Sequence, residues 1–360
     1  LSLHDALPIS KCNSNLMKLK NKEKSHPVRA FIMQNIEGHP QDIVQKVAEH
    51  FSVSRTTALR HMAQLIKQGH LIKTGTTKQT TYMLTSASQK VGRFGLSPSF
   101  EEYSVFSEFL APQLRQFKAN IFTILEYSVT EMLNNAKDHS RGHQVSLEFS
   151  LESDQIRVVI HDDGVGVFKN LLQAFHFDSP QEVIFELSKG KLTSSPAHHT
   201  GEGIFFSSRV LDLFTIKANG YCYVRDNLAH DWTFFELDKL DKKSKGTWIE
   251  LLINPNSDRV LRDLFESYQE EETLDFCKTE ILIDLAQQHG ERLISRSQAQ
   301  RVTQRLEKFS QATLDFKKVQ AVGQGFVDQV FRVYQSQRPG FKFVCVNMNS
   351  DVEFMIRRTI

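Results

Sequence analysis

The side chains best suited to chemistry lie in the stretch Glu131–Ser140, which predicts the last turns of a long helix. Glu131, Asn135 and Asp138 are spaced i, i+4 and i+7, so they share one helix face, while apolar residues occupy the face toward a sheet. Two carboxylates and an amide in such a row can hold a hydrated divalent cation and polarise a water molecule, as a nucleoside triphosphate site requires. Taken alone, the same row is more often an ordinary solvated helix face.

A carboxylate and two glycines follow the next predicted strands. Asp162 comes after an apolar strand, Ile156–Ile160, and Gly164 and Gly166 come soon after it. Glycine has no β-carbon, so a backbone or a ligand can approach these two positions closely. The segment therefore predicts a turn that contacts a ligand.

Two further pieces lie later in the chain. Gly201 and Gly203 precede a predicted apolar helix, Phe205–Phe214, and glycines at a helix N-terminus expose amide groups suited to phosphate. Thr247, directly after Gly246, begins the last strand of this part. Each piece alone is weak, but the four pieces in this order predict one nucleotide site.

Other kinds of site fit the sequence less well. The chain has no GxxxxGK[ST] phosphate loop. His139 and His143 are spaced for a metal pair, and His198 and His199 are adjacent, but no third ligand has a matching spacing. These histidines are better explained as surface or lid residues. No Ser-His-Asp or Cys-His arrangement is discernible, although such arrangements are spatial and a sequence can hide one.

The elements that must position this site form one predicted α+β unit over residues 119–255. A long helix comes first, and alternating apolar residues then predict two strands around a turn at Ser153-Asp154. Three more strands are predicted near Tyr221–Arg225, Trp232–Leu237 and Thr247–Ile253.

The N-terminal part of the chain is basic. Residues 1–90 carry 13 Lys and Arg against 5 Asp and Glu, whereas residues 91–360 carry 31 against 37, so nucleic acid is the partner expected of the N-terminal part. Hydrophobic periodicity predicts three short helices and a hairpin over residues 26–84, with Ser54 capping the third helix.

This order of elements resembles a winged helix-turn-helix. The resemblance implies that the third helix enters the major groove of double-stranded DNA. The face of that helix opposite its apolar stripe offers five candidate DNA-binding residues, which are Arg55, Thr56, Thr57, Arg60 and His61. A winged helix that docks another protein is the alternative.

The four pieces of the central unit resemble the four boxes of the GHKL superfamily, whose Bergerat ATP-binding fold is shared by gyrase-type ATPases, histidine kinases and anti-sigma-factor serine kinases. The resemblance covers residues 119–255 and implies ATP and Mg²⁺ as cofactors. It implies Asn135 as the Mg²⁺ ligand, Glu131 as the catalytic base or water-positioning carboxylate, and Asp162 as the acceptor from the adenine amino group. The other ATP-binding positions that it implies are Asp138, Gly164, Gly166, Gly201, Gly203 and Thr247. Residues 168–200, with Lys189 and Lys191, would be a mobile ATP lid.

From residue 274 to 360 the pattern predicts a small α/β sandwich domain. The stretch Leu314–Phe326 resembles the strand, loop and helix start of STAS domains, and Gly323–Arg332 is closer still to the STAS-like domain of unknown function found after such ATPases. In anti-anti-sigma STAS proteins a GHKL kinase phosphorylates a serine of this loop. Here Gly323, Gln324 and Gly325 offer no hydroxyl, so a docking or sensing domain with a protein partner is expected. Ser295, the nearest alternative, is predicted to cap a helix.

Composition and the remaining segments complete the expectations. No apolar run in the 360 residues approaches the roughly 18 residues of a membrane helix, so no membrane partner is expected. Four cysteines without a CxxC motif argue against a disulfide scaffold or a zinc ribbon and favour a reducing cytoplasm. Residues 1–25 are expected to be a disordered or artefactual lead-in, residues 85–118 a linker and helix, and residues 256–273 a connecting helix.

The sequence thus predicts a multidomain α/β protein with a winged helix-turn-helix, an α+β Bergerat ATP-binding sandwich and a small α/β STAS-like domain. The preferred hypothesis is an ATP-binding regulator that couples Mg-ATP binding to DNA binding and partner docking. The alternative is an anti-sigma-type protein serine kinase that acts on a separate substrate. A third class is an interaction module with a degenerate site. ATP hydrolysis and a homodimer are left open.

Overall fold

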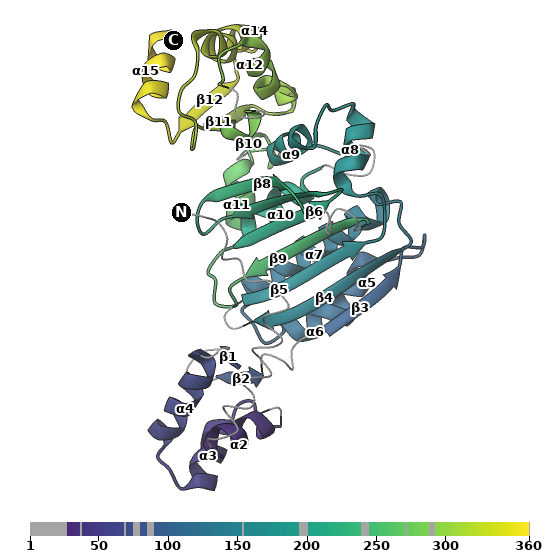
Figure 1. The fold of residues 1–360 in the computed structure, drawn as a ribbon, viewed down its shortest axis with the longest axis vertical. Helices are drawn as coiled ribbons and strands as arrows, with labels where there is room; N and C mark the ends of the chain where they lie inside the picture. Colours follow the sequence, from purple (N-terminus) through teal and green to yellow (C-terminus); the bar gives the residue numbers. More distant parts are fainter. Residues whose placement is uncertain are drawn as a thin grey trace.

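The computed structural model describes residues 27–36, 38–67, 70–74, 80–84, 90–152, 155–193, 201–238, 245–270, 272–287 and 292–359. Three units follow one another along the chain and along the long axis of the molecule (Figure 1). The prediction of a multidomain α/β protein is confirmed. The predicted lead-in, the tip of the N-terminal hairpin at 75–79, and His198 and His199 lie outside the described residues.

The N-terminal unit contains three helices and an antiparallel hairpin. These are α2 (Pro27–Asn35), α3 (Ile43–Phe51), α4 (Arg55–Lys67), β1 (Leu71–Thr74) and β2 (Thr81–Leu84). Ser54 Oγ accepts a hydrogen bond from Thr57 N at 3.1 Å, so the predicted cap of α4 is confirmed. The unit has a core of its own, made of Val28, Ile32, Ile36, Ile43, Val44, Val47, Ala58, Met62, Leu65, Leu71 and Tyr82. Ile72 of β1 belongs instead to the larger core of the rest of the molecule.

The central unit is built on a seven-stranded antiparallel sheet in the order β3-β4-β5-β9-β6-β7-β8. Its strands are β3 (Lys90–Gly95), β4 (Gln144–Glu152), β5 (Gln155–Asp162), β6 (Leu213–Ala218), β7 (Tyr221–Asp226), β8 (Asp231–Glu236) and β9 (Thr247–Ile253). Buried and half-buried residues alternate strictly along β9, as a strand with one face covered by helices requires.

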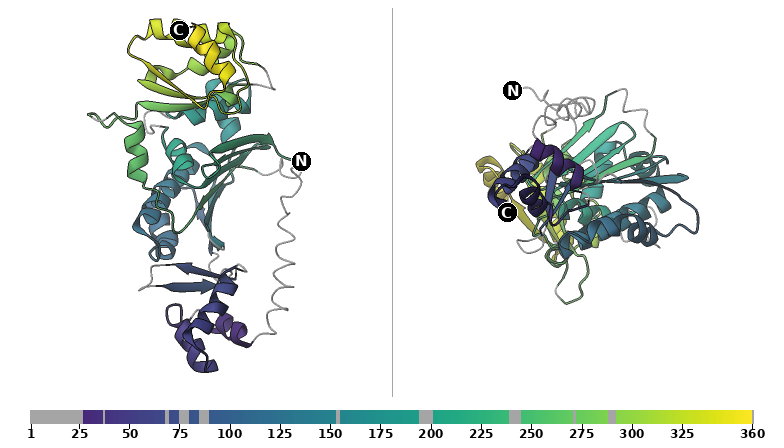
Figure 2. Two further views of the ribbon diagram at one scale, coloured as in Figure 1. Left: turned by 90° about the vertical axis from the view of Figure 1, so that its left-hand side faces the viewer. Right: turned by 90° about the horizontal axis from the view of Figure 1, so that it is seen from below.

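Helices cover one face of this sheet (Figure 2). They include α5 (Glu102–Val105), η2 (Phe106–Leu110), α6 (Ala111–Leu114), α7 (Ala119–His139), α10 (Gly203–Val210) and α11 (Leu261–Tyr268). Two more helices, α8 (Val167–Phe175) and α9 (Pro180–Lys189), lie on the side of the unit toward the C-terminus (Figure 1). None of the helices in the described ranges has both the length and the apolar composition needed to cross a membrane.

Two strands of the sheet differ from the prediction. Residues 90–95, predicted as linker, form the edge strand β3 on β4, and the glycines at positions 92 and 95 hide this strand in the sequence because they interrupt its apolar alternation. The helix predicted over Phe205–Phe214 ends at Val210, and residues 213–218 form β6. Pairing with β9 on one edge and β7 on the other outweighs the local pattern there. The central unit therefore begins near residue 90 and not at 119.

The C-terminal unit has three parallel strands in the order β10-β11-β12. Its strands are β10 (Lys278–Leu282), β11 (Gln311–Asp315) and β12 (Lys342–Val346), and its helices are η4 (Ile283–Ala286), α12 (Arg296–Thr303), η5 (Leu306–Lys308), α13 (Gln324–Val327), η6 (Asp328–Tyr334), α14 (Gln335–Gln337) and α15 (Ser350–Thr359). Strands and helices alternate in this unit, in agreement with the predicted α/β domain, and the helix that begins after Ser295 ends at Thr303. Ser295 caps α12 in a reciprocal arrangement with Gln298, as predicted.

One hydrophobic core runs through both the central and the C-terminal units. The ring of Phe276 lies 4.7 Å from Phe205 and 5.0 Å from Phe206, both on α10. Phe276 also lies 5.4 Å from Phe309, which belongs to the C-terminal unit. The two units therefore share their packing, whereas the N-terminal unit has a separate core.

Candidate functional site

A cavity of about 710 Å³ lies between α7, the sheet and the starts of α8 and α10. Its size is within the range of small-molecule and cofactor sites. Seven of the residues singled out from the sequence line it, namely Glu131, Asn135, Asp138, Asp162, Gly201, Gly203 and Thr247. The fold thus brings together residues from four segments that are far apart in the sequence.

Helix α7 supplies a polar wall of the cavity. Glu131, Asn135 and Asp138 all line it, while Val129 on the other side of the helix is fully buried, as the spacing predicted. A β-carbon at Gly203 would overlap the Glu131 carboxylate, so only glycine lets α10 begin this close to α7.

Two acidic residues, Glu131 and Glu202, lie near the start of α10. Burial raises the pKa of the Tyr127 hydroxyl, and the carboxylates of Glu131 and Glu202 raise it further. Both carboxylates therefore lie close enough to Tyr127 to act on its hydroxyl.

Asp162 lies at the end of β5 and is only 5% exposed. Its Oδ1 accepts a hydrogen bond from Gly164 N at 2.9 Å. Burial raises the pKa of the Asp162 carboxyl, and hydrogen bonds from Gly164 and Thr247 offset this in part. A β-carbon at Gly246, which has a φ of +80°, would overlap the Asp162 carbonyl, so this turn requires glycine. Asp162 is thus a rigidly held acceptor in the cavity wall.

Thr247 connects the sheet to α8. Its Oγ1 accepts a hydrogen bond from Val167 N at 3.0 Å, which fixes the start of α8 over the cavity. The cavity lining also has an apolar part, whose members include Met132, Ile160, Val167, Leu171, Ile204, Ile216 and Ile249. An apolar surface beside a buried acceptor suits a flat heteroaromatic ring that carries an amino group.

Gly164 and Gly166 are not among the residues that line the cavity, although the family resemblance implies them as ATP-binding positions. A β-carbon at Gly164 would overlap the carbonyl of Ser140 at the end of α7. Gly166 has a φ of +83° and faces the side chain of Asn219. The two glycines therefore shape the turn that carries Asp162, and their contact with a nucleotide stays a prediction.

The segment predicted as a lid also differs from expectation, because it contains α8 and α9. Lys189 is 1% exposed and its Nζ donates to Glu186 Oε1 at 2.7 Å. Lys191 Nζ donates to the carbonyl of Lys308 in the C-terminal unit at 3.1 Å. The assignment of these two lysines to a mobile lid is therefore wrong, since both are engaged at the contact between units.

Sequence reasoning missed four polar residues of the cavity, which are Asn134, Ser140, Asn170 and Thr193, and it assigned a fifth lining residue, His139, to the surface or lid. Asn170 is 6% exposed, and its Nδ2 donates to the carbonyl of His139 at 3.2 Å, which joins α8 to the end of α7. The amide of Asn170, next to Lys169 among the apolar residues of the stretch Val167–Leu172, was the available signal. Thr193 had no comparable signal in its surroundings.

A metal centre made by protein side chains alone is absent from the described part of the chain. Within those ranges, no three His, Cys, Asp or Glu side chains lie close enough to hold a metal ion together. The histidine pair considered from the sequence, His139 and His143, accordingly has no third ligand among the described residues.

The candidate DNA-binding residues lie on α4. Arg55, Thr56 and Arg60 are exposed, and His61 is half-buried. Thr57 is half-buried and its backbone N–H and Oγ1 both lie within hydrogen-bond distance of Ser54 Oγ, so Thr57 serves the cap of the helix. Three of the five candidates therefore form an exposed polar strip.

Comparison with known proteins identifies one part of the chain. Residues 298–353 match the family model described as a STAS-like domain of unknown function (DUF4325). The match runs from α12 into α15 and confirms the resemblance of the C-terminal unit to that family. No curated protein matches the chain.

Proposed function

We propose that this chain is a cytoplasmic regulator that binds Mg-ATP in the cavity of the central unit, in the manner of GHKL proteins, and couples its occupancy to DNA binding and to partner docking. One observation carries the proposal. A single cavity combines the buried acceptor Asp162 and an apolar surface with a row of polar groups on α7 and the glycine-flanked start of α10.

The residues near Asp162 fit an adenine base. The base has a flat apolar face and an exocyclic amino group that donates hydrogen bonds, and Asp162 is a buried acceptor next to an apolar surface. Asp162 has already lost most of its contact with water on folding. A hydrogen bond from the adenine amino group is therefore favourable, because it costs little further desolvation of Asp162.

The residues at the start of α10 fit phosphate and Mg²⁺. Gly201 and Gly203 leave backbone amides accessible at the positive end of α10, where an anion is stabilised. Mg²⁺ usually keeps several waters and phosphate oxygens, so it needs few protein ligands, and Asn135 would hold it beside Glu131 and Asp138. Bound Mg²⁺ would supply charge neutralisation for the phosphates at the start of α10.

The N-terminal unit is proposed to bind double-stranded DNA. The helix order, the hairpin and the exposed Arg55, Thr56 and Arg60 on α4 support this proposal, together with the basic surplus of residues 1–90. The STAS-like domain is proposed to dock a protein partner.

A protein serine kinase acting on a separate substrate is the second candidate. Glu131 favours it, because this carboxylate lies against the first residue of α10, where the terminal phosphate would be held, and it could orient an attacking hydroxyl or water.

Incubation of the full chain with γ-labelled Mg-ATP separates these functions. Release of labelled phosphate indicates an ATPase, transfer of the label to an added partner indicates a kinase, and binding without either indicates a sensor. Absence of Mg-ATP binding in calorimetry at millimolar nucleotide refutes the proposal.

A further inference from the structure

We propose that Lys189 is a positioning residue for the nucleotide cavity, and that the STAS-like domain sets the affinity of the cavity for ATP through it. The inference rests on the proposed function and concerns the regulation of that site. Leu187, Leu192 and Thr193, which flank Lys189 in the sequence, all line the cavity. Whatever holds Lys189 in place therefore holds this wall.

Lys189 joins α9 to the C-terminal unit through a buried ammonium group. Its Nζ donates three hydrogen bonds, to Glu186 Oε1 at 2.7 Å, to the carbonyl of Arg301 at 3.1 Å and to the carbonyl of Gln304 at 2.9 Å. An ammonium has three donors, so its capacity is fully used. The two carbonyls belong to the end of α12, where carbonyls lack partners within the helix and the helix dipole is negative. Lys189 thus caps a helix of the STAS-like domain.

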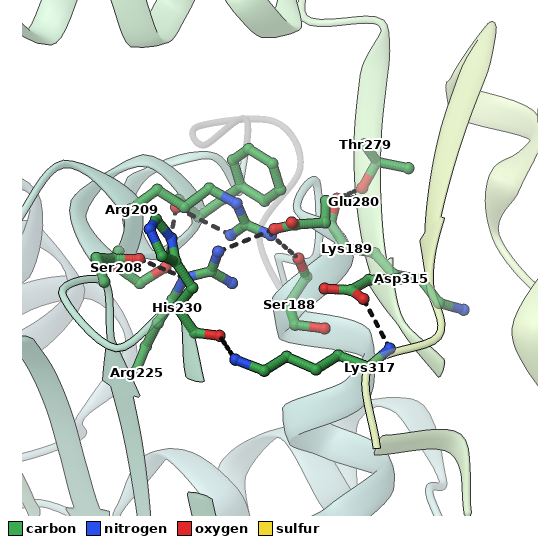
Figure 3. Close-up of polar contacts among 12 residues, drawn as sticks. Ser188, Lys189, Ser208, Arg209, Arg225, His230, Thr279, Glu280, Asp315 and Lys317 are labelled. Carbon is green, nitrogen blue, oxygen red and sulfur yellow. Dashed lines mark hydrogen bonds and ion pairs between the residues drawn. The ribbon is translucent and has the colours of Figure 1, made fainter. Parts of the chain in front are cut away.

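The end of α9 is held from the other side by β10 (Figure 3). Thr279 Oγ1 donates to the carbonyl of Lys189 at 2.6 Å, and Arg209 Nη2 donates to the carbonyl of Ser188 at 3.0 Å. Arg209 Nη2 also donates to Glu280 Oε2 at 3.2 Å. Because Arg209 lies on α10, which begins at the cavity, β10 of the STAS-like domain fixes both helices that border the proposed phosphate end.

The residues after Lys189 carry this connection to the cavity wall. Lys191 N donates to the carbonyl of Gly201 at 3.0 Å, and Gly201 lines the cavity. Lys191 Nζ donates to the carbonyl of Lys308 at 3.1 Å, while Lys308 Nζ donates back to the carbonyl of Lys191 at 3.3 Å. A shift of the STAS-like domain would therefore move Gly201 and its neighbours, whereas Asp162 and Thr247 lie on the central sheet.

A contribution to folding stability is a weak explanation for the buried ion pair of Lys189 and Glu186. Lys189 and Glu186 are 1% and 2% exposed, and replacing such a buried pair with apolar residues of similar volume is often neutral or stabilising. However, the other two hydrogen bonds of the Lys189 ammonium cap α12. The buried pair therefore favours one packing arrangement of α9 on α12. This is the property that a positioning residue requires.

The test compares two full-length variants by calorimetry with Mg-ATP and with adenosine. The double variant Glu186→Gln/Lys189→Met removes the ammonium without leaving a buried carboxylate unpaired. Lys318→Met is the matched control, because Lys318 Nζ also bridges the units, donating to the carbonyl of Trp232 at 3.0 Å, but lies away from α9. We expect the double variant to bind Mg-ATP about fivefold more weakly, with adenosine affinity unchanged and both affinities unchanged in the control.

Three results would overturn the inference. If the double variant binds Mg-ATP with unchanged affinity, Lys189 has no role in positioning the cavity, although the proposed nucleotide site itself is not contradicted. An equal loss for Mg-ATP and adenosine identifies a merely structural role. Absence of Mg-ATP binding in the wild-type chain refutes the proposed function itself and the inference with it.

A milder variant keeps the inference falsifiable if the double variant does not fold. Thr279→Val keeps the shape of the side chain but removes the donor to the Lys189 carbonyl. We expect a smaller loss of Mg-ATP affinity, about twofold, with adenosine again unaffected. Amide exchange of α12 should slow on Mg-ATP binding in the wild type and less so in this variant, and equal slowing in both would count against the proposal.

Discussion

Asp162 is a buried carboxylate in a cavity wall, and burying an ionised group costs free energy unless hydrogen bonds compensate it. Gly164 and Thr247 supply such bonds, yet burial still raises the pKa of Asp162 above the ordinary value of 3.8. The folded protein therefore retains a proton on this group to a higher pH than the unfolded chain does. A ligand that donates a hydrogen bond to Asp162 would recover part of this cost.

Asp162→Asn tests this account through the pH dependence of stability. Because the folded pKa is raised, the free energy of unfolding of the wild type falls as the pH rises through that pKa, and the variant lacks this fall. We expect the variant to be at least as stable as the wild type at neutral pH, and its advantage to shrink toward about pH 3 in urea unfolding. An advantage that is independent of pH would contradict the electrostatic explanation.

Asn135→Ala and Glu131→Gln separate binding from turnover. Asn135→Ala removes the proposed protein ligand of Mg²⁺, so we expect Mg-ATP affinity to fall by about tenfold, as the loss of a hydrogen bond to a charged group implies. Glu131→Gln should retain binding but lose hydrolysis or transfer by about 10²-fold. Calorimetry and phosphate release measure the two effects. Glu126→Gln, a carboxylate change on the same helix outside the cavity lining, is the control, and equal losses there would reject both roles.

Single residues of the site could be found from the sequence where a helix sets their spacing. Glu131, Asn135 and Asp138 needed only the period of α7 to be placed together. Gly164 and Lys189 could not be assigned in this way, because one packs on Ser140 and the other on α12, and both contacts are tertiary. The local sequence pattern indicates which residues share a face of a helix or strand. It does not indicate which other element packs against that face.

At the scale of elements, α4 is the proposed DNA-recognition helix. We expect Arg55→Ala and Arg60→Ala each to weaken binding of the full chain to duplex DNA by roughly 1–3 kcal/mol if they reach guanine edges. Lys46→Ala, an exposed cation on α3, is the control and should change affinity less. Fluorescence anisotropy at several salt concentrations measures this, and no binding even at low salt would make the unit a protein-docking module.

Helices and strands could be predicted where the hydrophobic periodicity of the sequence is strong. They were missed where pairing with neighbouring strands determines the structure. The helices of the N-terminal unit and the strands β4 and β5 follow clear periodicities. β3 contains two glycines in six residues, and β6 follows an apolar helix without an obvious break, so only the partner strands define them.

For the molecule as a whole, the two cores predict two unfolding transitions in calorimetry. The central and C-terminal units should unfold together because Phe276 packs on Phe205, Phe206 and Phe309, while the N-terminal unit should unfold separately. Phe276→Ala should lower the stability of the larger transition by about 3–5 kcal/mol and leave the smaller one unchanged. A shift of both transitions would show that the cores are coupled.

The shared core also bears on how such chains can be rearranged during evolution. The N-terminal unit has a core of its own and contacts the larger core through Ile72, so we expect it to be exchangeable for another module. The C-terminal unit shares its packing with the central unit through Phe276, so we expect Phe276 to be inherited together with Phe205 and Phe206. Among related proteins we therefore expect the N-terminal unit to vary most. The central and C-terminal units should occur together.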